Sequence, residues 1–326
     1  MKAKENLLRA IHHDGPDWVP NRMEAVKVLG PPVCERPGAA GLDAFGVRWS
    51  YEHGAEGGTF PAHGGHTIHD LERWREQITI PDVDELDWEP VIATAAEIDR
   101  DEMLVCAFVE MGLFERSYLL LGMEEALMAF ASEPEVMAEL LGAIADYKIR
   151  LIERFHEAVG LDMVWYGDDW GTQSDLFLSP ETWRRTIKPH TRRIYDCIKR
   201  CGAMVNQHSC GQIEAIFPDM VEMGADIWNP CQPCNDLADM KRRHGRRITF
   251  CGGIDSQFVL ARPGATCDEV RREVRRRIDE LAADGGYIAA PSHSVPYDAQ
   301  LLAAMNDEIA TYGRQCYAAR CQGGDE

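Results

Sequence analysis

The chain has 326 residues and is acidic: 54 aspartates and glutamates outweigh 34 lysines and arginines, which gives a formal net charge of −20. A charge of this sign and size repels phosphate backbones and anionic lipid surfaces, so it argues against nucleic acid and membranes as partners. The length permits one large core or two domains. Because no break in composition marks a boundary, we expect residues 1–326 to form a single domain.

The first predicted element is a short charged amphipathic helix within residues 1–18 (MKAKENLLRAIHHDGPDW). It lacks the apolar centre of a signal peptide, and no later stretch approaches the roughly eighteen apolar residues that a membrane span needs. The 11 cysteines are odd in number and scattered. This pattern favours free thiols in a reducing compartment, some of them available as ligands. We therefore expect a cytoplasmic protein.

Short apolar runs alternate with long helical patterns from about residue 100 onward, and each run is typical of a buried strand. The runs are residues 103–110, 161–169, 203–210, 225–230, 247–253 and 285–292. Helices are predicted between them. One spans Ser132–Val159, with Ser132 and Glu135 as a capping box, and another spans Cys267–Asp284. The alternation indicates parallel pairing of the strands.

Two further strands would complete a barrel. Residues 16–25 (PDWVPNRMEA) are predicted as a strand, and an eighth strand can lie within the irregular stretch 42–54 (LDAFGVRWSYEHG). This count favours an α/β (β/α)8 TIM barrel over an open doubly wound sheet. Residues 30–90, rich in glycine, proline and histidine, are predicted to be an irregular excursion over one end of the barrel.

Polar residues gather at the carboxyl ends of the predicted strands, which is where barrels build their active sites. They are Glu110, Asp168, Asp169, His208, Cys210, Asn229, Cys231, Gln232, Cys251, Asp255, Ser292 and His293. A plain structural core gives no reason for such residues at six consecutive strand ends. The sequence therefore predicts an active site at this edge.

A histidine and a cysteine one residue apart suggest a metal site. His208 and Cys210 alternate along an extended chain, so both side chains project from one face and can share one zinc ion. The alternative is that His208 satisfies a buried hydrogen bond and Cys210 is a small core residue. A catalytic zinc needs three protein ligands and one open position, and His293 is the predicted third ligand, with Cys251 as competitor and Glu110 as a possible fourth. If it is not a ligand, His293 is a general acid or a hydrogen-bond donor to substrate.

Three carboxylates are predicted to be catalytic: Asp168, Asp169 and Glu110. Asp168 and Asp169 directly follow an apolar strand, and their crowded charges raise one pKa or call for a cationic or hydroxyl-bearing ligand. Asp169 can instead cap the following turn. Glu110 ends the preceding strand and is a candidate base or ligand, with loop capping as its alternative.

From about residue 160 the chain resembles the uroporphyrinogen decarboxylase superfamily. The resemblance is carried, in order, by YGDDWGTQ, HSCG, MGADIWNPCQP, KRRHGRRITFCGGID and GGYIAAPSHSV. It implies a (β/α)8 barrel with one of two activities, cofactor-free porphyrinogen decarboxylation or zinc-dependent methyl transfer to or from corrinoid proteins. The decarboxylases resembled carry an N-terminal Arg-Gln-Ala-Gly-Arg stretch whose arginines hold the porphyrin carboxylates. The corresponding stretch here has Arg22 alone, a poor receptor for an octacarboxylate in an acidic chain.

The methyltransferase branch of that family is closer. It uses a His-x-Cys pair and a later cysteine as zinc ligands, and the resemblance places His208 and Cys210 on the pair and His293 where the later cysteine belongs. One thiolate with two neutral imidazoles leaves zinc about one charge more positive than two thiolates do. Such an ion is the stronger Lewis acid and would polarise a methoxy oxygen.

The resemblance thus implies a corrinoid-dependent methyltransferase. It would move a methyl group from a small donor, in particular a methoxylated aromatic compound, to the Co(I) of a separate corrinoid protein, because the chain has no Asp-x-His-x-x-Gly cobalamin signature of its own. Asp168 or Asp169 would orient the substrate. The pocket is predicted to include Trp165, Tyr166, Trp170, Asn229 and Gln232, with at least one of the aromatic residues packed in the core instead.

Three alternatives remain open at this point. One is the reverse half-reaction, in which a methylcorrinoid gives its methyl group to a thiol or to tetrahydrofolate. Another is a metal-free decarboxylase or lyase that uses Asp168, Asp169 and His293 as acid and base groups. The third is a small-molecule binder without catalysis on the same scaffold.

Overall fold

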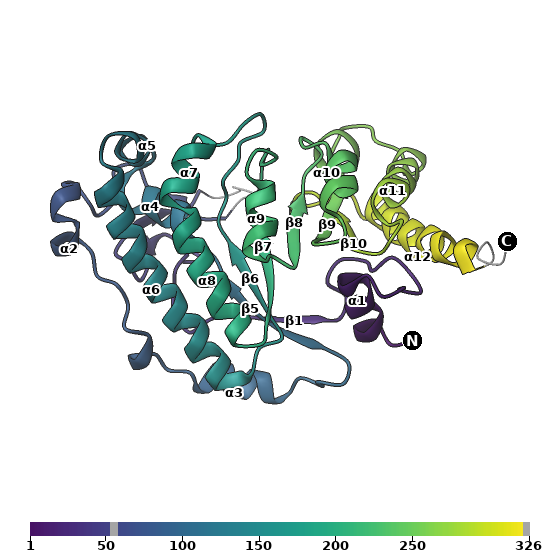
Figure 1. The fold of residues 1–326 in the computed structure, drawn as a ribbon, viewed down its shortest axis with the longest axis horizontal. Coiled ribbons are helices and arrows are strands. Elements are labelled where there is room, and N and C mark those ends of the chain that lie inside the picture. Colours follow the sequence, from purple (N-terminus) through teal and green to yellow (C-terminus); the bar gives the residue numbers. More distant parts are fainter. Residues whose placement is uncertain (53–57, 322–326) are drawn as a thin grey trace.

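A computed structural model describes residues 1–52 and 58–321 of the chain. Its centre is a seven-stranded parallel sheet in the order β1-β5-β6-β7-β8-β9-β10, curled as part of a barrel with helices on its outer side (Figure 1). The strands are β1 (Val26–Leu29), β5 (Leu104–Val109), β6 (Met163–Gly167), β7 (Met204–His208), β8 (Ile227–Cys231), β9 (Thr249–Ile254) and β10 (Tyr287–Pro291). The six strands predicted beyond residue 100 are confirmed. Strands such as β9, buried at every position, read as continuous apolar runs because both faces of the sheet are covered.

The predicted strand at residues 16–25 is wrong, because the first strand, β1, begins at Val26, after the end of this segment. Prolines occupy positions 16 and 20 and supply no N–H for a ladder, and Arg22 has a left-handed backbone with φ of 54°. The segment nevertheless touches the far edge of the sheet. Arg22 N–H donates to the Ala289 carbonyl at 2.7 Å, and Ala289 N–H donates to the Pro20 carbonyl at 2.9 Å. The chain just ahead of β1 therefore lies against β10, while β1 itself pairs with β5.

The eighth parallel strand sought in residues 42–54 is not found in the described part of that stretch; residues 53 and 54 lie outside the described residues. This region instead contributes to a small antiparallel sheet of β2 (Gly41–Leu42), β3 (Arg48–Ser50) and β4 (Phe60–Pro61). These strands are short, as expected for a region interrupted by glycine and proline.

Helices cover the outside of the large sheet. Helices α6 and α8 pack together beside β5 and β7, while α11 and α12 pack together beside β9 and β10 (Figure 1). The helices are α1 (Ala3–His12), α2 (Trp74–Gln77), α3 (Glu89–Ala96), α4 (Leu113–Leu121), α5 (Met123–Ser132), α6 (Pro134–Val159), α7 (Pro180–Thr186), α8 (Lys188–Arg200), α9 (Phe217–Met223), α10 (Leu237–His244), α11 (Cys267–Leu281) and α12 (Ala299–Cys321). No described helix combines the length and the apolar character needed to cross a membrane.

The predicted capping box at Ser132 is wrong. Ser132 is the last residue of α5, and its hydroxyl donates to the Met128 carbonyl. Helix α6 starts at Pro134 instead, because proline suits a first turn whose N–H groups have no helical partner. A capping box does precede α11, where Thr266 and Glu269 bond each other's backbone N–H groups.

A buried ion network holds the irregular segment around Glu35 and Asp43 beside the carboxyl end of β5. Arg116 of α4 donates to Asp43 at 2.6 Å and to Glu35 at 3.1 Å. Lys148 of α6 donates to the same Glu35 at 2.5 Å and to the Glu110 carbonyl at 2.6 Å. Removing one partner of such a buried network typically costs about 3–5 kcal/mol, because the remaining charge is left buried and unpaired. The segment around Glu35 and Asp43 is thus fixed at the edge of the sheet where the strands have their carboxyl ends.

Candidate metal centre and pocket

The structure brings three possible ligands together at the carboxyl ends of β6 and β7. The ligand atoms of Asp169, His208 and Cys210 all lie within 4.8 Å of one another. His208 Nε2 is 3.6 Å from Cys210 Sγ and 3.5 Å from an Asp169 carboxylate oxygen. Asp169 also accepts the Cys210 backbone N–H at 2.7 Å, which holds the two loops in register. The pair expected from the sequence is present, and its neighbour here is Asp169 rather than His293.

Asn229, in the middle of β8 and paired with His208 of β7, determines which nitrogen of His208 faces this cluster. The Trp165 indole can only donate, and its Nε1 lies 3.1 Å from Asn229 Oδ1, so this oxygen must be an acceptor. His208 Nδ1 lies 2.9 Å from the same oxygen and therefore carries the proton. The lone pair of His208 is left on Nε2, toward Cys210 and Asp169. This is how a hydrogen-bond partner usually prepares a histidine for a metal.

The electrostatics of the cluster favour a cation. Burial raises the pKa of the Cys210 thiol well above its usual range, and the negative charge of Asp169 raises it further. A nearby carboxyl on the first turn of α4, Glu115, has a raised pKa as well, because of burial and then the charges of Asp169 and Asp168. A bound metal ion would offset the crowding of these anionic groups and stabilise the thiolate. The sequence pattern did not reveal Glu115, whose only signal is its place in the helical turn that follows β5.

Asp168 is adjacent to Asp169 but faces the other way. It is fully buried and accepts hydrogen bonds from the backbone N–H groups of Phe114 at 3.2 Å and Glu115 at 3.0 Å, and from the Trp170 indole at 2.9 Å. Burial raises the pKa of Asp168 to about 6, although these three donors oppose the shift. Its carboxylate anchors the start of α4 and does not line the pocket described next.

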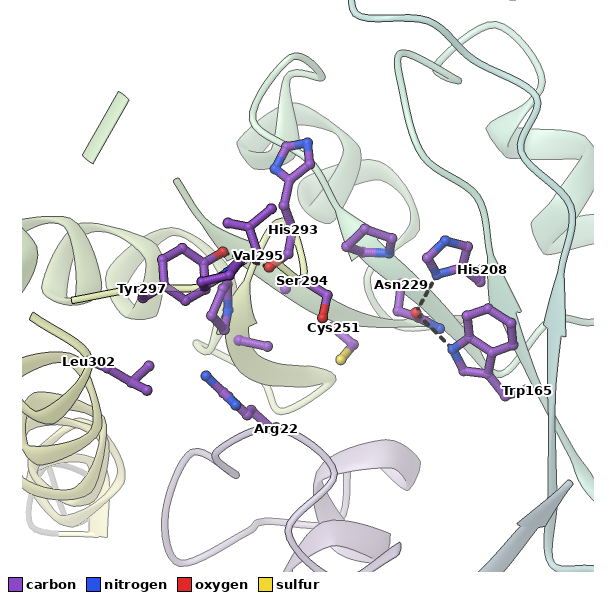
Figure 2. Close-up of a pocket in the computed structure, with 15 residues that line it drawn as sticks. Arg22, Trp165, His208, Asn229, Cys251, His293, Ser294, Val295, Tyr297 and Leu302 are labelled. Carbon is purple, nitrogen blue, oxygen red and sulfur yellow. Dashed lines mark hydrogen bonds between the residues drawn. The ribbon is translucent and has the colours of Figure 1, made fainter. Parts of the chain in front are cut away.

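A pocket of about 530 Å³ opens beside His208, within the size range of small-molecule sites (Figure 2). Its wall includes Arg22, Trp165, His208, Asn229, Cys251 and His293, and most of the remaining residues are prolines and aliphatic or aromatic side chains. Of the aromatic residues predicted to form the pocket, Trp165 does so. Tyr166 and Trp170 are 0% and 2% exposed and belong to the core. Glu110 is half-buried and is not part of this wall, and burial raises its pKa.

Gln232 is a hydrogen-bond partner of the second histidine of the pocket, His293. Its Oε1 accepts the Gly211 N–H at 2.6 Å, so its Nε2 must be a donor, and this nitrogen lies 3.2 Å from the Ser292 carbonyl and 2.9 Å from His293 Nε2. His293 Nδ1 lies 3.2 Å from the Ser292 hydroxyl. Both ring nitrogens of His293 therefore have protein partners. The predicted role of His293 as a zinc ligand stays a prediction, and so does substrate binding by Gln232.

Comparison with known proteins identifies the family. Residues 40–309 match the family model described as uroporphyrinogen decarboxylase (URO-D). The chain belongs to the URO-D family. This confirms the family that the sequence motifs resemble.

The relatives that this chain matches carry two kinds of name. A uroporphyrinogen decarboxylase from Syntrophotalea carbinolica is 29% identical over 59% of this chain and 51% of its own length. The methylcobamide:CoM methyltransferase MtaA from Methanosarcina barkeri is 26% identical over 39% of this chain and 34% of its own length. The chain thus aligns with about half, or less, of the length of these relatives.

A solved structure of a methyltransferase from Methanosarcina mazei matches with a TM-score of 0.70 at 17% identity, covering 96% of this chain and 99% of that one. At this identity the likeness concerns the fold. The match supports the interpretation of the curled seven-stranded sheet as part of a URO-D-like barrel.

Proposed function

We propose that this URO-D family member is a zinc-dependent methyltransferase. It would move a methyl group from a small methoxylated donor to the Co(I) of a separate corrinoid protein, with residues 1–326 forming one TIM-barrel domain. The observation that carries the proposal is the cluster of Asp169, His208 and Cys210, within 4.8 Å of one another beside an apolar pocket. The metal-free decarboxylase or lyase considered above would use Asp169 of this cluster but gives no role to the Cys210 thiol beside it.

The residues fit zinc in number and kind. One imidazole nitrogen, one thiolate and one carboxylate oxygen make the three protein ligands of a catalytic zinc, which leaves a fourth position for substrate. Asn229 already orients His208 for coordination. When bound there, zinc would supply a Lewis acid that polarises the oxygen of the methyl donor.

The protein's own groups would bind and place the donor. The Trp165 ring lies with its centroid 4.5 Å from that of His208 and offers a flat apolar wall for an aromatic ring next to the cluster. In the proposed reaction, the C–O bond of the donor would break as its methyl group passes to the corrinoid partner, whose Co(I) would supply the electron pair for the new bond. The departing oxygen keeps the electron pair of the broken bond and takes up a proton.

Transfer in the reverse direction, from a methylcorrinoid to a thiol, is the second candidate. It is supported by the similarity to the Methanosarcina barkeri methyltransferase. With His293 as the third ligand, zinc would be more positive than with two thiolates, which favours transfer from a methoxy donor. This difference disappears if Asp169 is the third ligand. Asp169 and the Cys210 thiolate together supply two negative charges, the same number as two thiolates would.

The test has two parts, metal content and turnover. We expect about one zinc per chain in the purified protein, as a three-ligand site binds a single ion. We expect methyl transfer from methoxybenzene derivatives to Co(I) cobalamin, followed by its absorbance change, to stop on chelation and return with zinc. Decarboxylation of uroporphyrinogen by the chelated protein would refute the proposal. Methylation of a thiol by methylcobalamin, without the forward reaction, would select the second candidate.

A further inference from the structure

We propose a second metal site, separate from the centre at the ends of β6 and β7. His66 and His69 would chelate one first-row transition-metal ion such as Zn²⁺, and Glu125 of α5 would supply a further ligand. The bound ion would join the segment that follows β4 to the start of α5. The site does not depend on the proposed methyl transfer.

The two rings have the spacing of a chelating pair. The ring centroids of His66 and His69 lie 4.9 Å apart, with an angle of 61° between the ring planes. Two imidazoles that bind one zinc ion at about 2.1 Å, at a tetrahedral angle, have centroids roughly 5 Å apart. The two rings therefore need little movement to share one ion.

The nitrogens of both rings are available to an ion. Within residues 1–52 and 58–321, no hydrogen bond or ion pair engages a ring nitrogen of His66 or His69. His69 is exposed and His66 is half-buried, so an ion can reach the pair from solvent. Histidines that only fill a core are buried and have hydrogen-bond partners, as most buried polar groups do. The pair also differs from His293, whose ring nitrogens both have protein partners.

Hydrogen bonds on both sides fix the segment that carries the pair. The Leu120 carbonyl, near the end of α4, accepts the N–H groups of Thr67 at 3.0 Å and Ile68 at 2.8 Å. The side-chain oxygen of Gln77 accepts the His69 N–H at 2.8 Å. Ligands on a fixed backbone lose less conformational freedom when they bind than ligands on a mobile chain.

A carboxylate lies on the α5 side of the pair. A Cβ atom built on Gly122, which links α4 to α5, would lie 2.5 Å from a Glu125 carboxylate oxygen and 3.6 Å from His66 Nδ1, so these two atoms flank one point. Glu125 is exposed and has no hydrogen bond or ion pair among the described residues. Those residues contain no second group of three possible ligands within 4.8 Å of one another, so the Glu125 side chain would have to rotate to reach the ion.

The proposed site is distinct from the centre at β6 and β7. The start of α4 is held by Asp168, the neighbour of Asp169, whereas the histidine pair is tied to Leu120 near the other end of the helix. Phe114, whose N–H donates to Asp168, and Leu120 are roughly 9 Å apart along the helix axis. Helices α4 and α5 lie on the side of the fold away from α12 (Figure 1).

The ligand types select the ion and its affinity. Imidazole suits zinc, copper and nickel, whereas Mg²⁺ and Ca²⁺ prefer sites made of oxygen atoms. Two imidazoles with a mobile carboxylate should bind more weakly than three ligands that already lie together and include a thiolate. We therefore expect dialysis to remove this ion and to leave the one held by Cys210.

Titration of the full chain with Co²⁺ after chelation tests the inference. Cobalt on a thiolate has a charge-transfer absorption that cobalt on imidazole and carboxylate lacks. We expect the wild type to bind two equivalents, the second without this absorption, and Cys210→Ala to retain the second. Excess Mg²⁺ should not displace it. The second equivalent should also raise the Tm, because it binds the folded chain.

Variants locate the second equivalent. His66→Ala and His69→Ala should each weaken it about a hundredfold, because binding by two linked ligands is lost. His63→Ala is the matched control, an exposed histidine of the same segment outside the pair, and should bind as the wild type does. Glu125→Gln should weaken binding by a smaller factor. Glu125→His would supply a third imidazole and should tighten binding about tenfold, a gain that misfolding does not produce.

Four results would each overturn the inference. They are uptake of one equivalent by the wild type, an unchanged second equivalent in His66→Ala or His69→Ala, an equal loss in His63→Ala, and no gain in Glu125→His. The absorption separates this site from the proposed function. Loss of the thiolate-bound equivalent alone would refute the metal centre at β6 and β7, and loss of the other alone would refute the site at His66 and His69.

Discussion

The carboxyl ends of β7 and β10 both present a histidine to the same pocket, but the surroundings of the two rings differ. At β7, Asn229 Oδ1 accepts a hydrogen bond from His208 Nδ1–H, so the lone pair on Nε2 faces a thiol and a carboxylate. At β10, Gln232 donates to His293 Nε2 and thereby uses the lone pair that a metal would need. The partner of the second ring nitrogen, more than the presence of a histidine, decides which ring can be a ligand.

The largest expected effect separates the two histidines directly. His208→Ala and Cys210→Ala should each lower zinc affinity by more than about hundredfold, beyond the range seen when only a ligand's hydrogen-bond partner is removed. His293→Ala should retain zinc. Metal analysis after dialysis against a calibrated chelator measures this. Equal loss of zinc in His293→Ala would show that His293 is the third ligand.

Asp169 and Asp168 provide the next contrast, because they are adjacent in sequence and face different surroundings. Asp169→Asn should weaken zinc binding about tenfold to hundredfold, since a neutral amide oxygen is a poorer ligand than a carboxylate. Asp168→Asn should leave zinc affinity nearly unchanged but lower the free energy of unfolding by about 1–3 kcal/mol, because buried donors lose acceptors. Zinc titration and urea unfolding on both variants distinguish the roles. The reverse pattern would show that Asp168 is the ligand.

Removing the group that orients His208 should have a smaller effect on the metal. Asn229→Ala leaves His208 Nδ1 and the Trp165 indole without their shared acceptor, and zinc affinity should fall about tenfold. Asn229→Asp keeps an acceptor oxygen and serves as the matched variant, with affinity at or above that of the wild type. If Asn229→Ala binds zinc as tightly as the wild type, His208 is oriented by something else.

The smallest expected effect concerns the titration of His293. Burial lowers the pKa of His293 in the folded protein. The hydrogen bond donated by Gln232 requires the neutral ring and should lower this pKa as well. Gln232→Ala should therefore raise the pKa of His293 toward its ordinary value, as followed by NMR of the ring protons. A decrease would mean that Gln232 accepts a hydrogen bond from His293 instead of donating one.

The strands of this fold were readable in the sequence because parallel strands covered on both faces are continuous apolar runs. All six predicted beyond residue 100 are present. The predictions failed where the chain follows no period. The first strand is displaced to Val26 by prolines and the left-handed Arg22, and residues 42–52 contribute to a separate antiparallel sheet. In such segments the local sequence pattern says little about the backbone conformation, because contacts with distant residues fix it, as the ion pairs of Arg116 with Glu35 and Asp43 do.

The candidate metal centre also has one part that the sequence predicts and another that only the tertiary structure sets. Alternation along β7 placed His208 and Cys210 on one face, and their position at a strand end pointed to a metal, so the sequence alone determined this pair. Asp169 at the cluster, Asp168 under α4 and His293 on Gln232 were decided by tertiary structure. Each depends on a turn after a strand and on a hydrogen-bond partner from a distant part of the chain. Asp169 accepts a hydrogen bond from Cys210, 41 residues later in the chain, and His293 contacts Gln232, 61 residues earlier. Spacing in sequence specifies neither the direction of a turn nor the partner that fills it, because both are set when the strands pack side by side.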